Sequence, residues 1–371
     1  MKPAREITPT LDSPLVVTGG GTGGHLYPAL AVAQAVRSLH PDVPILFIGR
    51  AVENDRREVE RYSLPFYGFA VEGLRRRLDG RNVVAMWRLL TALSGCLWLM
   101  RRYPRGVVFG VGGYVSAPAM LAGMILGWRV TLHEQNTVPG LVNRWLARWC
   151  DMVYLTYETT QDYMPHAHCE THGFPLRKAL RDAFQEQSQG SENWQPHILV
   201  IGGSQGAKRV VEIVLQAFEL LREKGVQFQA TVQTGRLNFD WALGLPCPNT
   251  VSRVAYIDNM ADAYRQADLI ISRAGSGSLS EIALWGLPAI LVPYPYASGD
   301  HQRKNAAYFA EQGAALVFEE HELSAERLAQ EIQRLIENNL ERANLARQMQ
   351  AMGRRNAHET IAGDLISRLE G

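Results

Sequence analysis

The sequence has few cysteines and almost no excess charge, and each shortage excludes a class of protein. Only four of the 371 residues are cysteine, and they lie far apart, at Cys96, Cys150, Cys169 and Cys247. Because a disulfide framework needs paired cysteines, this spacing indicates a protein of a reducing cytoplasm. The formal net charge is only +1 at pH 7, which argues against a surface that coats nucleic acid. We therefore expect no nucleic-acid partner.

Three familiar motifs are also missing. Residues 1–13 include charged side chains but no apolar stretch of a secretory signal, so we expect the chemistry to take place inside the cell. No glycine run continues into Gly-Lys-Ser or Gly-Lys-Thr, which excludes a P-loop. No Asp-x-Asp pair is present to hold a metal on a diphosphate. We therefore expect no metal and no cofactor, with charge stabilised by helix ends, N–H groups and Arg or Lys.

Apolar runs of strand length alternate with helix-like segments along the whole chain. Hydrophobic residues make up 46% and charged residues 20%, as in globular proteins, and the length suffices for two domains. The alternation predicts an α/β fold with parallel sheets and crossover helices, and we place the domain boundary within 166–177. The predicted strands are 15–18, 45–48, 107–109, 130–132 and 152–155 in the first half, and 198–201, 229–233, 251–254, 269–272, 289–292 and 315–318 in the second.

Three of these strands end in glycine-rich turns that open helix-like segments, at 19–25, 202–206 and 273–281. The first turn of a helix has unpaired N–H groups and a partial positive charge, so such starts favour phosphate. The first two turns predict two nucleotide-fold domains that face one cleft. In the third turn, serines add donors and Glu281 is placed to accept both hydroxyls of a ribose. The alternative is a capping box, with Ser276 or Ser278 as N-cap and Glu281 as partner.

Polar residues also follow strands at the carboxyl edge of the predicted sheets, where such folds bind ligands. In the first half this edge gathers His25, Tyr114, His133 and Glu134, a setting for a general base. In the second half, the polar run 299–306 opens a helix after a strand.

Two other interpretations of local patterns stay open. Gly19, Gly21 and Gly24 match a dinucleotide-binding G-x-G-x-x-G. The next strand, however, ends in Gly49-Arg50 and lacks the acidic residue that holds the ribose of NAD, so only an NADP-dependent oxidoreductase would fit this motif. The residues His166, His168, Cys169 and His172 crowd together as zinc ligands do.

Residues 83–100 form an apolar run broken by one full charge, Arg88, and flanked by arginines at 75–77, 101, 102 and 105. A charge in mid-run opposes a membrane-spanning helix. One apolar face is expected from the helical spacing of Met86, Leu90, Leu93, Leu97 and Met100, with Ser94 off it. We predict that 75–105 lies in the plane of an anionic membrane surface, with an ordinary packing helix as the alternative.

With these residues assembled, the chain resembles the MurG family of bacterial cell-wall glycosyltransferases. The matching segments follow in the family's order at 20–25, 112–116, 133–136, 202–207, 256–260 and 280–281. The resemblance implies a GT-B fold with two Rossmann-like domains around a cleft. Residues 1–175 would bind the acceptor and the membrane, 176–350 would bind the UDP-sugar, and 351–371 would return to the first domain.

The resemblance also implies an inverting transfer of N-acetylglucosamine from UDP-N-acetylglucosamine to the C4 hydroxyl of the N-acetylmuramoyl sugar of undecaprenyl-linked lipid I. The product, lipid II, serves peptidoglycan synthesis. The enzyme would be peripheral, at the cytoplasmic face of the inner membrane, with other cell-wall and division proteins as candidate partners.

Site residues carry over from the family position by position. Ile257 would meet the uracil, Glu281 the ribose, Ser204 and the serine turn the diphosphate, and His301 with Gln302 the sugar. The base would be His25 or Glu134, with His133 as a weaker candidate. The full donor set is Thr22, Gly23, Gly24, Asn136, Arg177, Ser204, Ile257, Ser276, Gly277, Ser278, Leu279, Ser280, Glu281, His301 and Gln302, and the acceptor set is Gly20, Gly21, Gly113 and Tyr114.

The sequence departs from the family at two positions of interest. Phe174 stands where the family has asparagine before Pro175, and His301 replaces the first of two glutamines, so the first sugar contact is open. Rival functions are a GT-B enzyme with another lipid acceptor, a UDP-sugar epimerase, an NADP-dependent oxidoreductase and a non-catalytic membrane adaptor.

Overall fold

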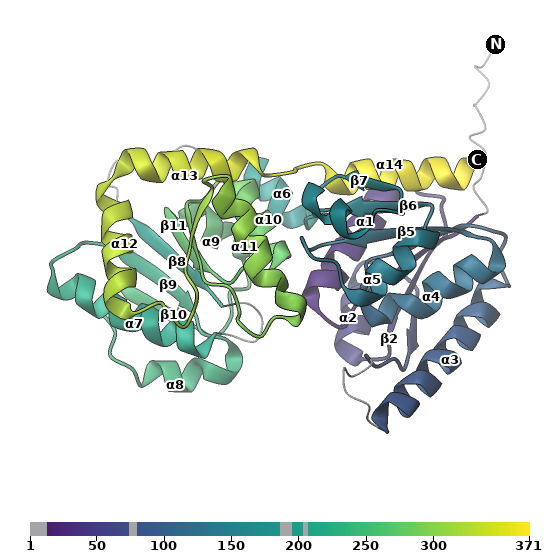
Figure 1. Cartoon of the computed structure of the whole chain (residues 1–371), viewed down its shortest axis with the longest axis horizontal. Coiled ribbons are helices and arrows are strands. Elements are labelled where there is room, and N and C mark those ends of the chain that lie inside the picture. Colours follow the sequence, from purple (N-terminus) through teal and green to yellow (C-terminus); the bar gives the residue numbers. More distant parts are fainter. Residues whose placement is uncertain (1–12, 74–79, 186–194, 203–206) are drawn as a thin grey trace, which may run out of the picture. The chain divides into compact units, whose positions relative to one another are not determined.

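The computed structural model describes residues 13–73, 80–185, 195–202 and 207–371 and divides the chain into two compact units. Unit 1 contains the chain up to Gln135, then Pro139–Arg177 and Asn356–Gly371, and unit 2 contains Asn136–Val138 and Lys178–Arg355. Each unit has one sheet covered by helices (Figure 1), and all strand pairs among the described residues are parallel. The predicted fold class is confirmed.

Unit 1 is built on a seven-stranded sheet in the order β3-β2-β1-β4-β5-β6-β7. The strand order reverses at β1 and β4, which places a ligand-binding edge at the carboxyl ends of these strands. The elements are β1 (Leu15–Thr18), α1 (Gly23–Leu39), β2 (Ile45–Arg50), α2 (Glu53–Arg61), β3 (Phe66–Phe69), α3 (Arg81–Met100), β4 (Val107–Gly110), α4 (Gly113–Leu126), β5 (Arg129–Glu134), α5 (Leu141–Leu146), β6 (Met152–Leu155), β7 (Cys169–Thr171) and α14 (Ala357–Glu370).

Unit 2 repeats the pattern with six strands in the order β10-β9-β8-β11-β12-β13. Here the order reverses at β8 and β11, the strands that precede the second and third glycine turns. The elements are α6 (Lys178–Gln185), β8 (His197–Ile201), α7 (Lys208–Glu223), β9 (Gln229–Gln233), α8 (Phe239–Leu243), β10 (Val251–Val254), α9 (Met260–Gln266), β11 (Leu269–Ser272), α10 (Ser276–Trp285), β12 (Ala289–Leu291), α11 (His301–Glu311), β13 (Ala315–Val317), α12 (Ala325–Glu337) and α13 (Asn339–Ala351).

The strands predicted from apolar runs are all present, with ends that differ by at most two residues. Two edge strands were missed, β3 and β7, and β7 lies inside the segment interpreted as a domain boundary. Both are short and only partly buried, so neither carries the continuous apolar run of a strand in the middle of a parallel sheet. The central strands could be predicted from sequence because they are buried on both faces and are therefore continuous apolar runs.

The sheet of unit 1 separates two apolar cores. One contains α1 together with Ile361, Ala362, Leu365 and Ile366 of the C-terminal helix α14. The other lies under α3, α4 and α5. The last helix of the chain is therefore part of unit 1, although the segment just before it belongs to unit 2.

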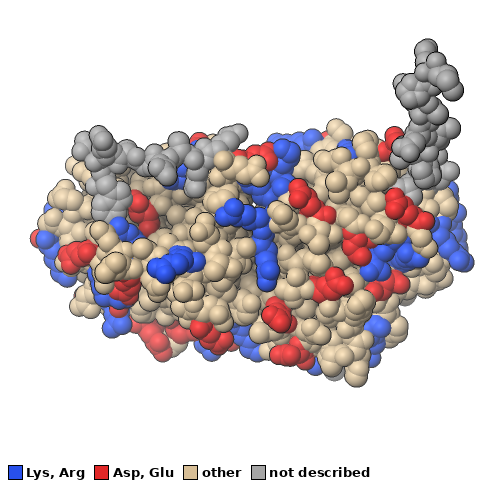
Figure 2. Space-filling model, turned by 90° about the horizontal axis from the view of Figure 1, so that it is seen from above, with Lys and Arg blue, Asp and Glu red and all other residues tan. Residues whose placement is uncertain are grey.

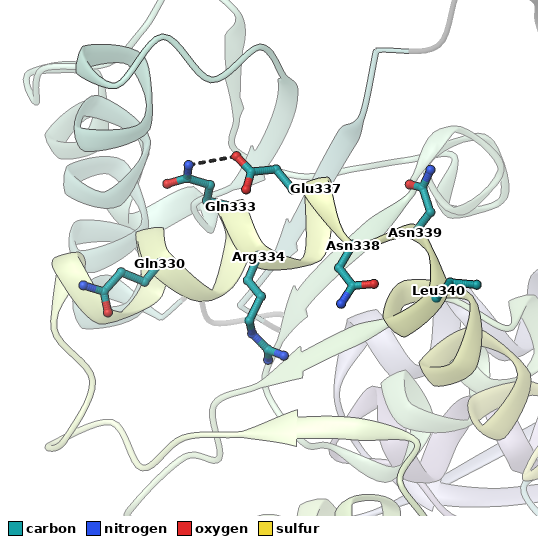
Figure 3. A pocket seen from close by; sticks show the side chains of 7 residues that line it. All are labelled: Gln330, Gln333, Arg334, Glu337, Asn338, Asn339 and Leu340. Carbon is teal, nitrogen blue, oxygen red and sulfur yellow. Dashed lines mark hydrogen bonds between the residues drawn. The ribbon is translucent and has the colours of Figure 1, made fainter.

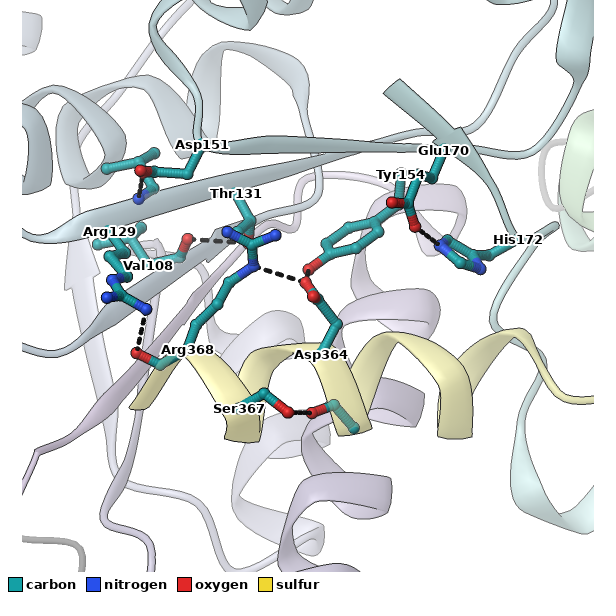
Figure 4. Close-up of polar contacts among 12 residues, drawn as sticks. Val108, Arg129, Thr131, Asp151, Tyr154, Glu170, His172, Asp364, Ser367 and Arg368 are labelled. Atoms are coloured by element: carbon teal, nitrogen blue, oxygen red, sulfur yellow. Dashed lines mark hydrogen bonds and ion pairs between the residues drawn. The ribbon is translucent and has the colours of Figure 1, made fainter. Parts of the chain in front are cut away.

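A polar cluster fixes α14 to the strands of unit 1 (Figure 4). The Tyr154 hydroxyl of β6 donates a hydrogen bond to Asp364 of α14, and Arg368 Nε donates to the same carboxylate oxygen at 2.6 Å. Arg129 of β5 donates to the carbonyl of Arg368 at 3.1 Å. Burial alone would raise the pKa of Asp364, but the bonds from Arg368 and Tyr154 outweigh it and hold that pKa below its ordinary value.

We expect Asp364→Ala to destabilise unit 1 by roughly 1–3 kcal/mol, because the buried Tyr154 hydroxyl loses its acceptor. The Asp364 contribution should be fully present above the ordinary carboxyl pKa near 4 and should fade as the pH falls through its lower folded value. Hydrogen exchange of α14 at pH 7 and at pH 3 measures both effects. Ser367→Ala on the exposed side of α14 is the control, and equal protection in the two variants would contradict the prediction.

Charged side chains of both signs are interspersed over the face shown in Figure 2, without a continuous field of one sign. This distribution agrees with the near-zero net charge of the chain.

Candidate functional site

The first glycine turn leads from β1 into α1 through backbone that favours glycine. Gly20 has φ +125° and Gly21 has φ +79°, and a Cβ on Gly20 would lie 2.8 Å from Asp55 Oδ2. The Gly21 N–H donates to the same Asp55 oxygen at 2.9 Å, so α2 holds the turn in place. The N-cap residue of α1, Thr22, makes no side-chain cap, and the first turn of α1 has no acidic residue. This helix start retains the features that favour an anion.

His25 lies in the first turn of α1 and is held by its neighbour. Thr22 Oγ1 and His25 Nδ1 are 2.9 Å apart. If Nδ1 carries the ring proton and donates to Thr22, Nε2 is the ring's proton acceptor. The Nε2 atom is 3.7 Å from where a Cβ on Gly113 would stand, so His25 lies beside the start of α4. The predicted sheet edge therefore brings His25 close to Gly112 and Gly113 at the start of α4.

Glu134, at the end of β5, is almost fully buried and has a structural task. Its Oε2 accepts hydrogen bonds from Asn143 Nδ2 at 2.6 Å and from the Gly140 N–H at 3.2 Å. Asn143 Oδ1 in turn accepts the Gly113 N–H at 3.2 Å. A side chain on Gly112 would collide with Asn143, since its Cβ would come within 2.4 Å of the amide. Glu134 therefore supports the start of α4 through Asn143.

His133 is fully buried, with an exposed fraction of 0%. Its Nε2 lies 3.0 Å from the Gly173 carbonyl and its Nδ1 lies 3.0 Å from Gln135 Nε2, while Phe174 packs edge-on against the ring. Burial lowers the pKa of His133 to about 4. Both ring nitrogens are therefore engaged in the core, an arrangement that disfavours His133 as a general base. Phe174, the departure from the family motif, fills the same core.

Two further predicted residues of unit 1 lie near the first glycine turn. The Arg177 guanidinium lies over the ring of Tyr27 in α1, 4.7 Å from its centroid. The Tyr114 hydroxyl accepts from Arg50 Nη1 at 3.5 Å and is 4.0 Å from where a Cβ on Gly21 would stand. The acceptor set predicted from the resemblance, Gly20, Gly21, Gly113 and Tyr114, is therefore gathered at one edge of the unit 1 sheet.

In unit 2, the third glycine turn opens α10 at Ser276. The N-cap is Gly275, which has no side chain to cap the helix, and no acidic residue lies in the first turn. The alternative of a capping box is therefore wrong. Glu281 lies in the second turn, where its Oε2 accepts the Tyr264 hydroxyl of α9 at 2.8 Å. Leu279 is buried in the core, and Ser276 is buried at the helix start.

The start of α11 meets the strand ends of β11 and β12 through Gln302. Gln302 Oε1 accepts the N–H of Ala274 at 3.2 Å and the N–H of Tyr294 at 3.0 Å. His301 Nδ1 donates to the Ser298 carbonyl at 2.7 Å, and this bond fixes the ring against the segment that precedes α11. Both residues are partly exposed. His301 and Gln302, the two residues predicted to face the sugar, thus lie at the start of α11, and Gln302 contacts the turn just before α10.

Asn305, which belongs to the polar run 299–306, ties Asn136 to α11. It is fully buried, and its Oδ1 accepts from both the N–H and the hydroxyl of Thr137 at 3.0 Å. Its Nδ2 donates to Asn136 Oδ1 and to the Ala274 carbonyl, each at 3.2 Å. A buried asparagine inside a polar helix start gives no periodic signal, so only the structure reveals this role.

Some predicted features lie elsewhere or outside the description. Ser204 and Arg75–Arg77 are outside the described residues, and Ile257 is partly exposed between β10 and α9. Within the described ranges, no three His, Cys, Asp or Glu side chains are grouped as metal ligands, and His172 is instead 3.0 Å from Glu170. A hollow of about 550 Å³ at the junction of α12 and α13 (Figure 3) contains none of the predicted site residues.

Comparison with known proteins gives the class of this arrangement. Residues 15–155 match the model of the glycosyltransferase family 28 N-terminal domain, and residues 197–361 match that of its C-terminal domain. The two Rossmann-like units are therefore those of a GT-B glycosyltransferase.

Relatives along the whole chain make the assignment narrower. The chain is 34% identical to the UDP-N-acetylglucosamine--N-acetylmuramyl-(pentapeptide) pyrophosphoryl-undecaprenol N-acetylglucosamine transferase of Desulforudis audaxviator, covering 96% of this chain and 98% of the relative. The protein of the same name from Desulforamulus reducens is also 34% identical, with 93% and 96% covered. The solved structure of Acinetobacter baumannii MurG has a TM-score of 0.76 at 28% identity, with 96% and 99% covered. The chain belongs to the MurG family within glycosyltransferase family 28.

More distant structures share the fold alone. A UDP-GlcNAc 2-epimerase from Neisseria meningitidis, solved with UDP-GlcNAc bound, has a TM-score of 0.68 at 13% identity, with 96% of this chain and 100% of the neighbour covered. At that identity the likeness carries no information on the reaction.

Proposed function

We propose that this protein transfers N-acetylglucosamine from UDP-N-acetylglucosamine to the C4 hydroxyl of the N-acetylmuramoyl sugar of lipid I, releasing UDP and forming lipid II. The observation that carries the proposal is the family membership along the whole chain, joined to an α10 start built of small and hydroxyl residues before Glu281. The names of the relatives state the same donor and acceptor.

The donor would be held mainly by unit 2. Its diphosphate would lie at the N-terminus of α10, where Gly275 leaves the helix uncapped and Ser276, Ser278 and Ser280 supply hydroxyls. Glu281, whose orientation is set by Tyr264, would accept the ribose hydroxyls. The sugar would be met by His301 and Gln302 at the start of α11 and by Asn136, which Asn305 holds nearby.

The acceptor would be deprotonated by His25. Its Nδ1 is held by Thr22, a partner that orients the ring as a general base requires. The hydroxyl of the acceptor would attack the anomeric carbon directly and invert its configuration, while the bond to the UDP oxygen breaks. The charge that grows on the leaving diphosphate would be stabilised by the preorganised N–H and hydroxyl donors of α10, and the proton would leave on His25 Nε2.

A transfer assay with labelled UDP-N-acetylglucosamine and a lipid I analogue tests the proposal. We expect label in a lipid II analogue and one UDP released for each transfer. An epimerase would convert UDP-N-acetylglucosamine without any acceptor. Conversion of that kind, or label transferred only to an unrelated lipid, would overturn the proposed function.

We further propose that unit 1 binds the cytoplasmic face of the membrane through α3. This helix alone, among the described residues, is long and apolar enough to cross a membrane. One side of it is buried through Ala85, Ala92, Cys96 and Leu99, so a position in the membrane plane fits better than a crossing.

The outward side of α3 differs from the predicted stripe. Met100 is buried, and Leu93 and Leu97 pack on the core, so the stripe expected as one apolar face is wrong. The packing direction of the helix decides this: the exposed line is Val83, Trp87, Leu90, Ser94 and Trp98, with Trp87 67% and Trp98 61% exposed. The Arg102 guanidinium lies over Trp98, 3.3 Å from the ring centroid, and Arg101 is exposed beside it. Aromatic rings next to arginines suit an anionic headgroup layer.

We expect the double variant Trp87→Ser, Trp98→Ser to bind vesicles with anionic lipid at least about tenfold more weakly, because two exposed aromatic anchors are lost. Cosedimentation measures the binding, and transfer to a water-soluble acceptor analogue should stay unchanged. Leu237→Ser, at an exposed apolar residue of unit 2, is the matched control. Vesicle binding equal to that of the wild type would remove α3 from the proposal.

A further inference from the structure

A tyrosine behind the donor site contacts the carboxylate on which the ribose assignment depends. Tyr264, on α9, donates its hydroxyl to Glu281 Oε2 at 2.8 Å. Only 1% of Tyr264 is exposed, whereas Glu281 is partly exposed at the surface of α10. The phenol therefore reaches the carboxylate from the protein interior, on the side away from solvent.

The ring of Tyr264 is held rigidly enough to serve as a fixed donor. It packs against Trp285 at 6.0 Å with an interplanar angle of 31°, and Phe184 packs edge-on against Trp285 at 5.5 Å. Arg265 lies over the same indole at 5.9 Å. Because aromatic packing fixes the ring, the hydroxyl cannot follow a carboxylate that rotates, and the hydrogen bond selects one orientation of Glu281.

Orientation matters because of what a carboxylate must do to recognise a ribose. Two vicinal hydroxyls of one sugar need two acceptor oxygens at a fixed angle, and a glutamate on a helix surface otherwise samples several rotamers. A hydrogen bond to a charged acceptor is stronger than one between neutral groups, so a single phenol suffices to restrict the side chain.

The helix that carries Tyr264 also connects two parts of the donor site. α9 begins at Met260, directly after the segment of Ile257, and Asn259 caps it by accepting the N–H of Asp262. The proposed uracil contact thus lies in the segment that leads directly into the helix of the donor to Glu281.

We propose that Tyr264 is a positioning residue that gives the site its preference for ribose over 2-deoxyribose, by holding Glu281 toward the sugar hydroxyls. The inference rests on the proposed function, since it deepens the donor site assigned there. Tyr264 touches no substrate itself.

Titration calorimetry of the full chain with UDP and with 2′-deoxy-UDP tests the inference. We expect the wild type to prefer UDP by about tenfold, and Tyr264→Phe to lose most of this preference by weakening UDP about tenfold, since one charged hydrogen bond is worth roughly that factor. Binding of 2′-deoxy-UDP should weaken by less, no more than about threefold, because only its 3′ hydroxyl still meets Glu281 and the phenyl ring keeps its packing. Tyr103→Phe, in unit 1, is the control.

Several outcomes would overturn the inference. Equal weakening of both nucleotides would assign Tyr264 a packing role only, and an unchanged preference would remove it from recognition altogether. In a Glu281→Ala background, Tyr264→Phe should add nothing to the loss of UDP affinity, so an additive effect also contradicts a role through Glu281. If the wild type bound no UDP, the proposed function itself would be overturned. If the wild type preferred UDP and Tyr264→Phe kept the same preference, only the inference on Tyr264 would be overturned.

Discussion

His25→Ala should lower kcat for transfer to a lipid I analogue by about 10²–10⁴-fold, the range for loss of a general base. Binding of UDP should change little, because the residues proposed to hold the ribose and the diphosphate lie mainly on α10. The reason for choosing His25 over Glu134 is geometric. Glu134 is buried and committed to Asn143 and Gly140, whereas His25 is partly exposed at a helix start, with its ring oriented by Thr22.

Two variants make this result interpretable. His40→Ala removes a histidine at the other end of α1 and should leave kcat within about twofold. Thr22→Val should have a smaller effect than His25→Ala, since it loosens the ring without removing it. If His25→Ala kept more than about a tenth of the wild-type kcat, His25 would not be the base.

Glu281→Ala should weaken UDP binding by about 100-fold, since two hydrogen bonds from ribose hydroxyls to a charged acceptor are lost. Titration calorimetry in buffer with EDTA measures this, and the wild-type affinity should be the same with and without the chelator. Glu311→Ala, at an exposed position on α11, is the control for loss of one negative charge.

An unchanged UDP affinity in Glu281→Ala would contradict the ribose assignment, and the inference on Tyr264 would then fail as well. Loss of wild-type binding in EDTA would instead contradict the proposal that helix-start donors alone hold the diphosphate. The Glu281→Ala variant therefore tests the ribose contact, and the EDTA experiment independently tests how the diphosphate is held.

The sequence located the elements of the site far better than the orientations of side chains. Strand ends at 15–18, 130–132 and 269–272 placed His25, Glu134 and the serine turn at sheet edges, because buried parallel strands are continuous apolar runs. The same pattern could not tell that His133 and Glu134 are both buried and engaged by neighbouring groups, whereas His25 is partly exposed. Nor could helical spacing in 83–100 say which side of α3 meets the sheet, and the stripe chosen from spacing alone was wrong.

Local motifs were ambiguous where one pattern serves two purposes. In sequence, Ser276, Ser278 and Glu281 are compatible with both a capping box and a ribose site, although the density of glycine and serine favours ligand binding. The structure excludes the capping box, because α10 begins at Ser276 with Gly275 as N-cap, which places Glu281 in the second turn against Tyr264. Tyr264 had no recognisable pattern, and the polar run that contains Asn305 did not reveal its role, since each residue acts through a partner distant in sequence.

The sequence alone determined the α/β class, the positions of the glycine turns and the family, because apolar runs, glycine-rich turns and ordered motifs are properties of short segments. Tertiary structure decided which side chains face solvent, which histidine is accessible and which partner holds Glu281. These outcomes depend on contacts between residues such as Tyr264 and Glu281 or Tyr154 and Asp364, and packing, not local propensity, brings them within hydrogen-bond distance.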